Sequence, residues 1–598
     1  MAEKILQSGH FQLRYQDGAI RKLKIGDSEI IRMMYFAVRD RNWGTVPARI
    51  IHETVEQKAG GFEVQLTVES VQQDIDFSTR ISISGQQDQI TFAVLGTANS
   101  SFLKNRIGIC ALHPIRECAG KPAKVLHPDN SSETFRFPEY ISPEQPVKEI
   151  RELEWDPQPE IHARLRFEGD IFEMEDQRNW TDASFKTYCT PLSLPFPSAI
   201  EKGETVQQTI VLTAEVKGKS GAKAGKRIQV EWDETRPFRL PEIGLGVSSR
   251  EEAMLEEEAA VFSCIAVARL RADIHMTDQA WPDELEKAMH ESALLQKHLF
   301  VCLYLDDDFD YQLQAFISAA RAARLQAVMP VNRRHLPHSR FRKIAAALRT
   351  AFPGIRVGTG VNAHFAELNR NRPDMADADF IGFAASPQVH AFDDLSLIEN
   401  HEGLSAAVRS ARKLFPHLPV WISPLTLKQR FNVVATAEET VIPGQLPPQV
   451  DVRQSSVFAA SWTLGAISRL AQAGAAAVDL FETTGWRGIM QGNFQAPLPG
   501  LFPATVNETF PLFHLLQMLN GTLEGYPSIS SNPSVIEGLI VRKHKSLDLI
   551  LANYSGEQQR VQLAFRAKAA ASHKKQDPDM NNSVLLEPFA LSTFRRFR

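Results

Sequence analysis

At 598 residues the chain is too long for one hydrophobic core, and typical domain sizes predict about three domains. A formal net charge of −5, without a basic surplus, argues against nucleic-acid binding. The sequence shows no secretory signal and no apolar run near the ~20 residues of a membrane helix, so we expect a cytoplasmic protein with no membrane partner. The oligomeric state stays open.

The first ~230 residues show the alternating polar and apolar pattern of β-strands. Clear examples are Phe62–Val68 and Arg80–Ser84, and an Asp17-Gly18 turn joins two further runs. Because helical periodicity is nearly absent, this region is expected to form a large β-sandwich. The glycine- and lysine-rich stretch Lys217–Arg227 is interpreted as a hinge, since no strand-to-helix context supports a phosphate-binding loop.

From Pro241 onward, short apolar strands alternate with amphipathic helices. Eight strands are predicted: Ile243–Val247, Val267–Ile274, Leu299–Leu305, Leu325–Val331, Ile355–Gly360, Phe380–Ala384, Pro419–Ser423 and Ala476–Phe481. Eight such repeats in about 270 residues match a (β/α)8 TIM-type barrel, with an open doubly wound sheet as the alternative.

After about residue 525 the pattern returns to strands, first at Ile536–Lys543 and Leu547–Tyr554. The expected fold class is therefore multidomain α/β plus β, with a central barrel between an N-terminal and a small C-terminal β-sandwich. The expected domains are 1–235, 236–524 and 525–598.

Catalytic groups of barrels follow the carboxyl ends of the strands, so these positions are the first to consider. Glu367 lies in a dense polar cluster after the fifth strand, and Glu482 directly follows the eighth. Glutamates from strands three apart would face each other across the barrel mouth as an acid–base pair. The alternative for each is a surface glutamate or a salt bridge to an arginine.

Other strand ends supply candidates for substrate binding. Asn362 and His364 follow the fifth strand, and Trp486 follows Glu482 closely enough to cover a sugar ring. His390 follows the sixth strand, with Asp393 as a carboxylate that would orient its imidazole. The alternative is that Asp393 caps the next helix.

Two further candidates come from the second and seventh strands. By alternation, His275 shares one face with Arg269, Arg271 and Asp273, and this face is expected to line the barrel interior. Arg430 lies in a long loop after the seventh strand and is a candidate to hold a carboxylate product, although solvated charge is an equal alternative.

The segment Glu173–Tyr188 interrupts the β-alternation with charged and aromatic side chains. One interpretation is that it extends over the barrel mouth and completes the site. The other is an internally hydrogen-bonded loop between domains.

Several chemistries lack their sequence signatures. There is no Gly-x-Ser-x-Gly elbow, no His-Glu-x-x-His and no dinucleotide-binding glycine motif after a strand. The five cysteines have no metal-ligand spacing. We therefore expect no cofactor and no metal, while a scattered site from His275, His364 and His390 stays open as an alternative.

Several segments resemble those of the D-apionate lactonases. The resemblance is carried by Ala37–Thr45, Asn105–Pro114, Glu173–Tyr188, Ala363–Arg370, Ser386–Asp394 and Phe481–Gly488. It implies hydrolysis of D-apionolactone to D-apionate in the bacterial use of apiose, and a chain of three parts with a central barrel.

The barrel is also similar to those of retaining glycoside hydrolases, whose acid and nucleophile follow strands four and seven. In this sequence the glutamates follow strands five and eight, and Ala366 rather than asparagine precedes Glu367. This offset weakens the glycosidase interpretation.

The resulting hypothesis is a lactonase that acts on a small-molecule sugar lactone. Glu482 would be the general base, and Glu367 or a histidine the general acid. Asn362, His364 and His390 would stabilise the oxyanion. The alternatives are a glycoside hydrolase using the same two glutamates and a non-catalytic carbohydrate-binding protein.

Overall fold

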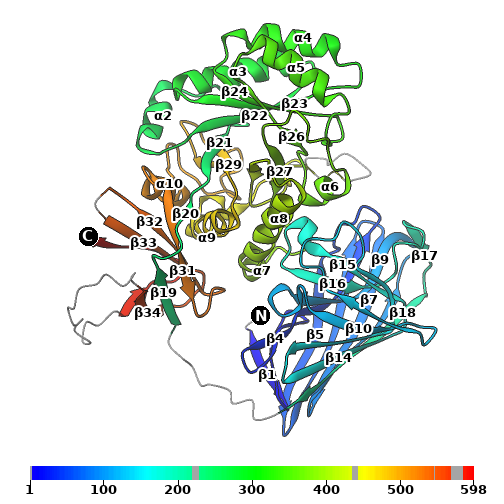
Figure 1. The fold of residues 1–598 in the computed structure, drawn as a ribbon. Helices are drawn as coiled ribbons and strands as arrows, with labels where there is room; N and C mark the ends of the chain where they lie inside the picture. Colours follow the sequence, from blue (N-terminus) through cyan, green and yellow to red (C-terminus); the bar gives the residue numbers. More distant parts are fainter. Residues whose placement is uncertain are drawn as a thin grey trace. The chain divides into compact units, whose positions relative to one another are not determined.

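A computed structural model describes residues 3–217, 228–431, 433, 442–544, 546–566 and 583–597. The chain divides into two compact units (Figure 1). The first consists of the described residues within Met1–Arg178 and Ala183–Gly225, and the second of those within Asn179–Asp182, Lys226–Val433 and Glu439–Arg598. The lysine- and glycine-rich stretch interpreted as a hinge lies almost entirely outside the described residues.

The first unit is built from two antiparallel sheets. One has the order β1-β2-β3-β4-β9-β16-β15-β12, with β17 paired to β9. Its strands are β1 (Lys4–Ser8), β2 (Phe11–Gln16), β3 (Ala19–Ile25), β4 (Ser28–Asp40), β9 (Phe102–Pro114), β12 (Val147–Ile150), β15 (Phe172–Asp176), β16 (Ser184–Tyr188) and β17 (Ser198–Ile200).

The other sheet has the order β11-β10-β13-β14-β18-β8-β7-β6-β5. Its strands are β5 (Ala48–Lys58), β6 (Gly61–Gln72), β7 (Ile75–Gln86), β8 (Gln89–Ala98), β10 (Pro122–Leu126), β11 (Ser132–Arg136), β13 (Glu152–Gln158), β14 (Ile161–Glu168) and β18 (Thr205–Val216). One hydrophobic cluster joins the two sheets, with Ile109 from the first and Phe92 from the second. The alternation expected for Phe62–Val68 and Arg80–Ser84 is present, since buried side chains alternate with more exposed ones along most of β6 and β7.

The second unit contains a parallel barrel with the sheet order β25-β24-β23-β22-β21-β29-β28-β27-β26. Its strands are β21 (Glu242–Gly246), β22 (Arg269–His275), β23 (His298–Tyr304), β24 (Leu325–Val331), β25 (Arg356–Val357), β26 (Thr359–Gly360), β27 (Ile381–Ala385), β28 (Val420–Leu425) and β29 (Ala477–Thr484). The short β30 (Gly488–Met490) pairs with β29. All eight predicted barrel strands are thereby confirmed within the described residues.

The fifth barrel strand is split at Gly358 into β25, which pairs with β24, and β26, which pairs with β27. A Cβ atom at Gly358 would lie 2.2 Å from the Phe380 ring, and that ring is stacked on Trp421. Glycine is therefore needed at this position, because the Phe380 ring fills the space that a side chain would take.

Helices accompany the barrel strands. They are α2 (Glu256–Val261), α3 (Trp281–Leu294), α4 (Asp310–Ala319), α5 (Phe341–Ala351), α6 (Phe365–Arg370), α7 (Asp394–Glu399), α8 (His401–Leu414), α9 (Val457–Ala473) and α10 (Pro511–Leu519). A short α1 (Ile115–Cys118) lies in the first unit. Within the part of the chain that the structure describes, every helix is too short or too polar to cross a lipid bilayer.

The C-terminal strands form a sheet of order β35-β34-β19-β31-β32-β33-β36, with β20 paired to β31. These strands are β19 (Ile228–Asp233), β20 (Phe238–Arg239), β31 (Glu524–Ser530), β32 (Ile536–Arg542), β33 (Ser546–Asn553), β34 (Gln559–Arg566), β35 (Ser583–Leu586) and β36 (Leu591–Phe597). The predicted first domain, 1–235, includes β19, yet β19 pairs with β31 and β34. Sequence alternation identifies a strand but not its partner, so the division at residue 235 stays a prediction.

Candidate functional site

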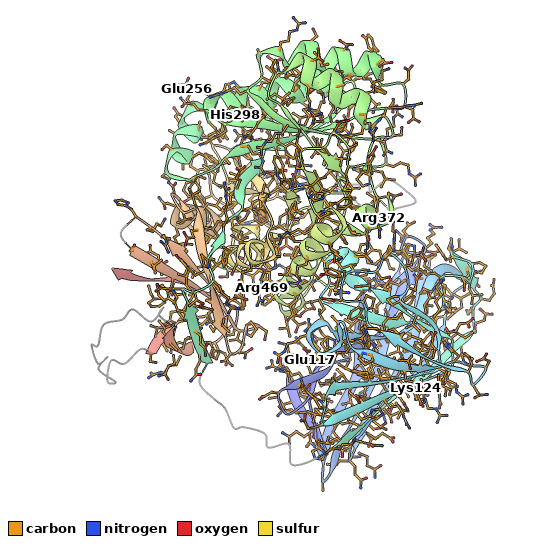
Figure 2. The ribbon with its side chains drawn as sticks, in the orientation of Figure 1. Glu117, Lys124, Glu256, His298, Arg372 and Arg469 are labelled. Carbon is orange, nitrogen blue, oxygen red and sulfur yellow. The ribbon has the colours of Figure 1, made fainter. Side chains whose placement is uncertain are left out.

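The site is organised by side chains at the carboxyl ends of the barrel strands (Figure 2 shows the side chains of both units). Arg269 and Arg271 of β22 are both buried, and each contacts a residue of another barrel strand. Arg269 pairs with Asp479 of β29 at 2.8 Å. Arg271 donates from Nε to Ser423 Oγ of β28 at 2.9 Å.

A hydrogen-bonded network spans the barrel mouth from β22 to β26. Both terminal nitrogens of Arg271 donate to Asp273, at 2.6 and 2.8 Å, and one also donates to Asn362 Oδ1 at 3.0 Å. The Asn362 amide donates to Asp273 at 2.7 Å and to the Tyr304 hydroxyl at 2.5 Å. The Tyr304 hydroxyl in turn bonds to His335 Nδ1 at 2.8 Å. This network fixes the orientation of the predicted residue Asn362.

Burial and charge determine how the groups of this network ionise. Burial alone would raise the pKa of Asp273, but the Arg271 guanidinium outweighs it and the pKa is lowered. Burial lowers the pKa of His275, against the opposing field of Asp273. The His275 ring stacks on Tyr304 with centroids 3.7 Å apart. His275 is therefore a neutral imidazole at neutral pH.

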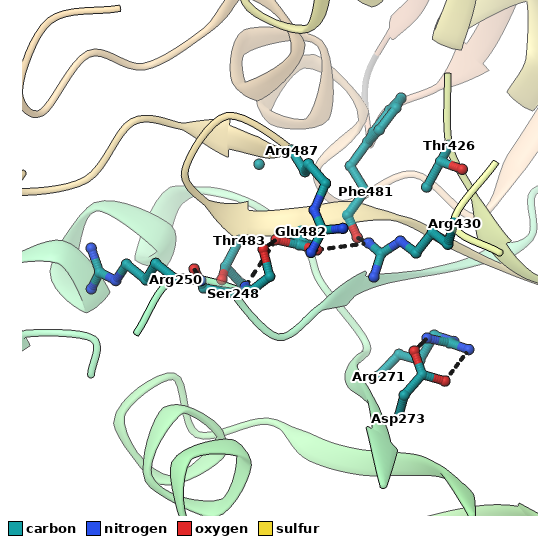
Figure 3. Close-up of polar contacts among 12 residues, drawn as sticks. Ser248, Arg250, Arg271, Asp273, Thr426, Arg430, Phe481, Glu482, Thr483 and Arg487 are labelled. Atoms are coloured by element: carbon teal, nitrogen blue, oxygen red, sulfur yellow. Dashed lines mark hydrogen bonds and ion pairs between the residues drawn. The ribbon is translucent and has the colours of Figure 1, made fainter. Parts of the chain in front are cut away.

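Glu482 is completely buried, and both of its carboxylate oxygens are engaged (Figure 3). Oε2 accepts hydrogen bonds from the backbone N–H and the hydroxyl of Ser249, at 2.9 and 2.8 Å. Oε1 lies 3.1 Å from an Arg430 nitrogen and 3.0 Å from an Arg487 nitrogen. Burial would raise the pKa of Glu482, yet the two guanidinium groups and Ser249 lower it overall. Glu482 is thus a carboxylate at neutral pH.

A bulge in β29 sets the direction of Glu482. The pairing with β21 skips Phe481, whose φ of 43° lies in the left-handed region that is unfavourable for a side chain of this size. The Phe481 carbonyl accepts a hydrogen bond from Arg430 at 3.2 Å. A Cβ atom at Gly246 would lie 2.5 Å from this carbonyl oxygen, which explains the glycine on the neighbouring strand.

The Arg430 side chain lines two small cavities. One is lined by Arg430 with Trp486, Arg487 and Phe481, and the other by Arg430 with Asn362, His364 and Phe431. Burial lowers the pKa of Arg430 to about 10, so its guanidinium stays charged at neutral pH. Of the predicted site residues, Trp486 lines the first cavity, Asn362 and His364 line the second, and Arg430 lines both, while their roles stay predictions.

His364 is 6% exposed, and its Nε2 atom has no hydrogen-bond partner among the described residues. Burial lowers its pKa to about 4, with a smaller contribution from His390. The imidazole is consequently neutral near pH 7 and keeps one nitrogen available to a ligand.

The structure corrects the predicted partner of His390. Its Nδ1 bonds to Asp182 at 2.7 Å, and its ring packs edge-on against Trp180. Asp393 instead caps α7 by accepting from Ser396 N at 3.0 Å, which was the alternative interpretation. Asp182 is distant in sequence, so proximity along the chain pointed to the wrong carboxylate.

Residues Asn179–Asp182 pack with the loops of the barrel. Besides the contact of Asp182 with His390, the Thr181 hydroxyl donates to the Ser386 carbonyl, and Asn369 donates to Asn179 at 3.2 Å. This middle part of the segment Glu173–Tyr188 is thus grouped with the barrel unit, while its role in completing the site stays a prediction.

Glu367 lies on the short helix α6, which follows β26. It is 8% exposed, lines neither of the two small cavities, and has one carboxylate oxygen without a partner among the described residues. Burial raises its pKa against the field of Arg370. No hydrogen bond joins Glu367 and Glu482 within the described residues, and their role as an acid–base pair stays a prediction.

Sequence reasoning missed Ser249, Tyr304, His335 and Arg487. Each lies at or just after the carboxyl end of a barrel strand, so the positional rule would have found them if every strand end had been considered. As for the metal alternative, the described residues contain no group of three or more His, Cys, Asp and Glu side chains arranged to hold a metal ion.

A closed parallel barrel with ionised and neutral acid–base groups at its carboxyl end defines a TIM-barrel enzyme. Residues 1–217 match the N-terminal domain of D-apionate lactonase, and residues 243–523 match its TIM barrel domain. The chain belongs to the D-apionate lactonase family, whose name places it among the carboxylic ester hydrolases.

Individual proteins can be compared as well. The D-apionate lactonase of Brucella anthropi is 29% identical over 626 residues, which cover 99% of this chain and 96% of that protein. A GH30 endoxylanase from Clostridium papyrosolvens shows 9% identity and a TM-score of 0.40, covering 62% of this chain and 100% of its own. A family 51 α-L-arabinofuranosidase from Bifidobacterium longum shows 9% identity and a TM-score of 0.41, covering 62% and 95%.

Proposed function

We propose that this chain hydrolyses D-apionolactone to D-apionate at the mouth of its barrel. The observation that carries the proposal is a surplus of positive charge there. The guanidinium groups of Arg271, Arg430 and Arg487 stand against the carboxylates of Asp273 and Glu482, so three positive charges meet two negative ones. Support for the substrate comes from the family and from the printed name of the Brucella relative.

Lactone hydrolysis develops negative charge at each stage after water attacks the carbonyl carbon. An oxyanion forms first, and the ring C–O bond then breaks to leave a carboxylate and a hydroxyl group. A pre-organised guanidinium stabilises both anions and needs no reorganisation during the reaction. Arg430 suits this role because it lines both cavities and is held in place by Glu482 and the Phe481 carbonyl.

The predicted role of Glu482 as general base stays open, and its contacts favour a different role. Its two oxygens already bind Ser249, Arg430 and Arg487, and its lowered pKa makes it a weak base. Glu482 would then act by positioning the two guanidinium groups. Glu367, which lines neither small cavity, is less suited to serve as the acid.

His364 is the better candidate to move the proton. His364 lines the same cavity as Arg430 and Asn362, and its Nε2 atom has no hydrogen-bond partner among the described residues. The neutral imidazole would accept a proton from the attacking water and return it to the departing ring oxygen. Each cavity is far smaller than a sugar lactone, so substrate binding requires side chains such as Phe431 to move.

The proposed function is tested by acid release in a lightly buffered pH-indicator assay. D-Apionolactone is compared with common aldonolactones and with nitrophenyl glycosides, each with and without EDTA. We expect fast, EDTA-resistant release from D-apionolactone. Release only from the glycosides would contradict the proposal, and no observation on the paired glutamates favours that outcome.

A further inference from the structure

A cleft of about 560 Å³ lies on the barrel unit, and it shares no lining residue with the two small cavities described above. Its wall comes from the loop after β24, the first turn of α5 and the segment after α6. Its charged lining residues are Arg340, Arg342, Lys343, Arg372 and Asp374. Cations therefore dominate this cleft.

The N-terminus of α5 is unusual for its charge. A helix N-terminus carries partial positive charge and is normally stabilised by acidic residues or a capping side chain. The first turn of this eleven-residue helix has no acidic residue, and Arg340 at its N-cap makes no side-chain cap. Arg342 and Lys343 instead add two positive charges to this turn. Such an end is unfavourable by itself and becomes favourable when an anion binds.

Carboxylates neutralise only part of this charge. Arg342 pairs with Asp374 at 2.6 Å, and Lys343 pairs with Asp310 at 2.7 Å. The Arg340 side chain has no ion pair among the described residues. Arg372, labelled in Figure 2, donates from Nε to the Asn369 carbonyl at 3.2 Å and faces no described carboxylate partner. Four cations against two carboxylates leave a surplus of two positive charges.

A second, independent observation points to a ligand. Thr359 of β26 lines the cleft and is completely buried. Its hydroxyl oxygen has no hydrogen-bond partner among the described residues. Buried hydroxyl groups in native proteins nearly always have a partner, so this one is explained when a ligand or an ordered molecule occupies the cleft.

From these observations we propose that the cleft binds a phosphate group, either as free phosphate or as a phosphate monoester. A dianion matches the surplus of two charges, and arginine forks suit phosphate oxygens. The inference goes beyond lactone hydrolysis and does not depend on it. The cleft adjoins the candidate site, since its lining residues Leu336 and Thr359 lie one and three residues from His335 and Asn362. The Asn362 N–H donates to the His335 carbonyl at 2.9 Å.

The test is calorimetric titration of the full chain with inorganic phosphate and with glycerol 3-phosphate at constant ionic strength. Sodium acetate and sodium chloride serve as reference anions. Saturable binding of either phosphate probe, without saturable binding of acetate, is expected. Tighter binding of glycerol 3-phosphate would identify a phosphorylated metabolite as the ligand, and equal affinity would identify phosphate itself. A lack of saturable binding by both probes would overturn the proposal.

Variants locate the binding. Arg340→Gln and Arg372→Gln should each weaken phosphate binding about tenfold or more, since each removes a charge-assisted contact. Arg321→Gln is the matched control because Arg321 is exposed on the same unit and does not line the cleft. Thr359→Val keeps the shape of the buried side chain and should weaken binding without lowering the melting temperature. Unchanged affinity in the Arg340→Gln/Arg372→Gln double variant would contradict the assignment even if phosphate binds elsewhere.

Discussion

At the scale of single residues, the site depends on which groups are charged and which are already occupied. Glu482 and Asp273 are carboxylates held by guanidinium groups, whereas His364 and His275 are neutral because burial lowers their pKa values. The ion pairs of Glu482 and Asp273 with arginines determine the charge of the site and the positions of the guanidinium groups. A neutral imidazole with a free nitrogen can transfer a proton.

Replacing Glu482 with Gln should lower kcat/KM of D-apionolactone hydrolysis by about 10²-fold or more, because it removes the charge that holds Arg430 and Arg487. Steady-state kinetics measures this effect. Glu537→Gln is the control, since Glu537 is also buried and paired with an arginine, Arg469, but lies on β32. A rate near normal in Glu482→Gln would remove this residue from the site.

Replacing His364 with Gln should lower kcat by about 10²–10⁴-fold, the usual contribution of a general acid–base group, with a smaller change in KM. His401→Gln is a matched control. His401 is likewise a buried histidine with a pKa lowered to about 3, but its Nε2 bonds to the Trp462 carbonyl of α9. If only KM changes in His364→Gln, the residue binds substrate and another group moves the proton.

At the scale of elements, α3 supports the loops that hold Glu482. Glu291 of α3 is 1% exposed and accepts a hydrogen bond from the Thr483 hydroxyl, and the Ser248 N–H donates to it at 3.3 Å. These two partners are the neighbours of Glu482 and of Ser249. One helix thereby connects the ends of β21 and β29.

The ionisation of Glu291 makes a prediction about stability and pH. Burial raises its pKa from 4.5 to about 7, so the protonated form is the one that favours the fold. This stabilisation is complete below pH ~4.5 and is lost as the pH rises through about 7, amounting to about 3 kcal/mol. Glu291→Gln, which mimics the protonated form, should therefore gain stability over the parent chain between pH 4.5 and 8.

Calorimetric unfolding of both proteins across this range measures the difference. Glu286→Gln, exposed on the same helix, should show no such trend. The stability difference between Glu291→Gln and the parent chain could instead be the same at every pH. Ionisation of Glu291 would then not change the free energy of unfolding, which would contradict the prediction.

At the scale of the whole molecule, β19 precedes the barrel in sequence but belongs to the C-terminal sheet. It pairs with β34 in parallel and with β31 in antiparallel orientation, and Trp232 contributes to the core of that sheet. In sequence, the barrel therefore lies between β19 and the other main strands of the same sheet. This arrangement favours cooperative unfolding of the barrel together with the C-terminal sheet.

Two fragments test this arrangement. A fragment of residues 226–598 retains β19, whereas a fragment of residues 236–598, cut at the predicted boundary, lacks it. We expect the shorter fragment to have a lower melting temperature and soluble yield, because β31 and β34 lose their shared neighbour. Equal melting temperatures would show that β19 is dispensable and that the predicted boundary is adequate.

The sequence by itself determined the local structure. Alternation and helical periodicity located the ends of the eight barrel strands to within three residues. The segments that resemble the D-apionate lactonases identified the family. It also indicated that Arg430, Asn362, His364 and Trp486 lie near the barrel mouth. These properties depend on neighbours along the chain, and for that reason they can be read from the sequence.

Only the tertiary structure decided which groups meet. It paired Glu482 with Arg430 and Arg487, gave His390 the carboxylate of Asp182, and joined β19 to the C-terminal strands. Each of these contacts joins different elements, and most join residues far apart in the sequence. Chain folding rather than a local pattern sets the distance between such residues. The charge and protonation of the site depend on those distances and on burial, so its chemistry emerges only once the barrel has closed.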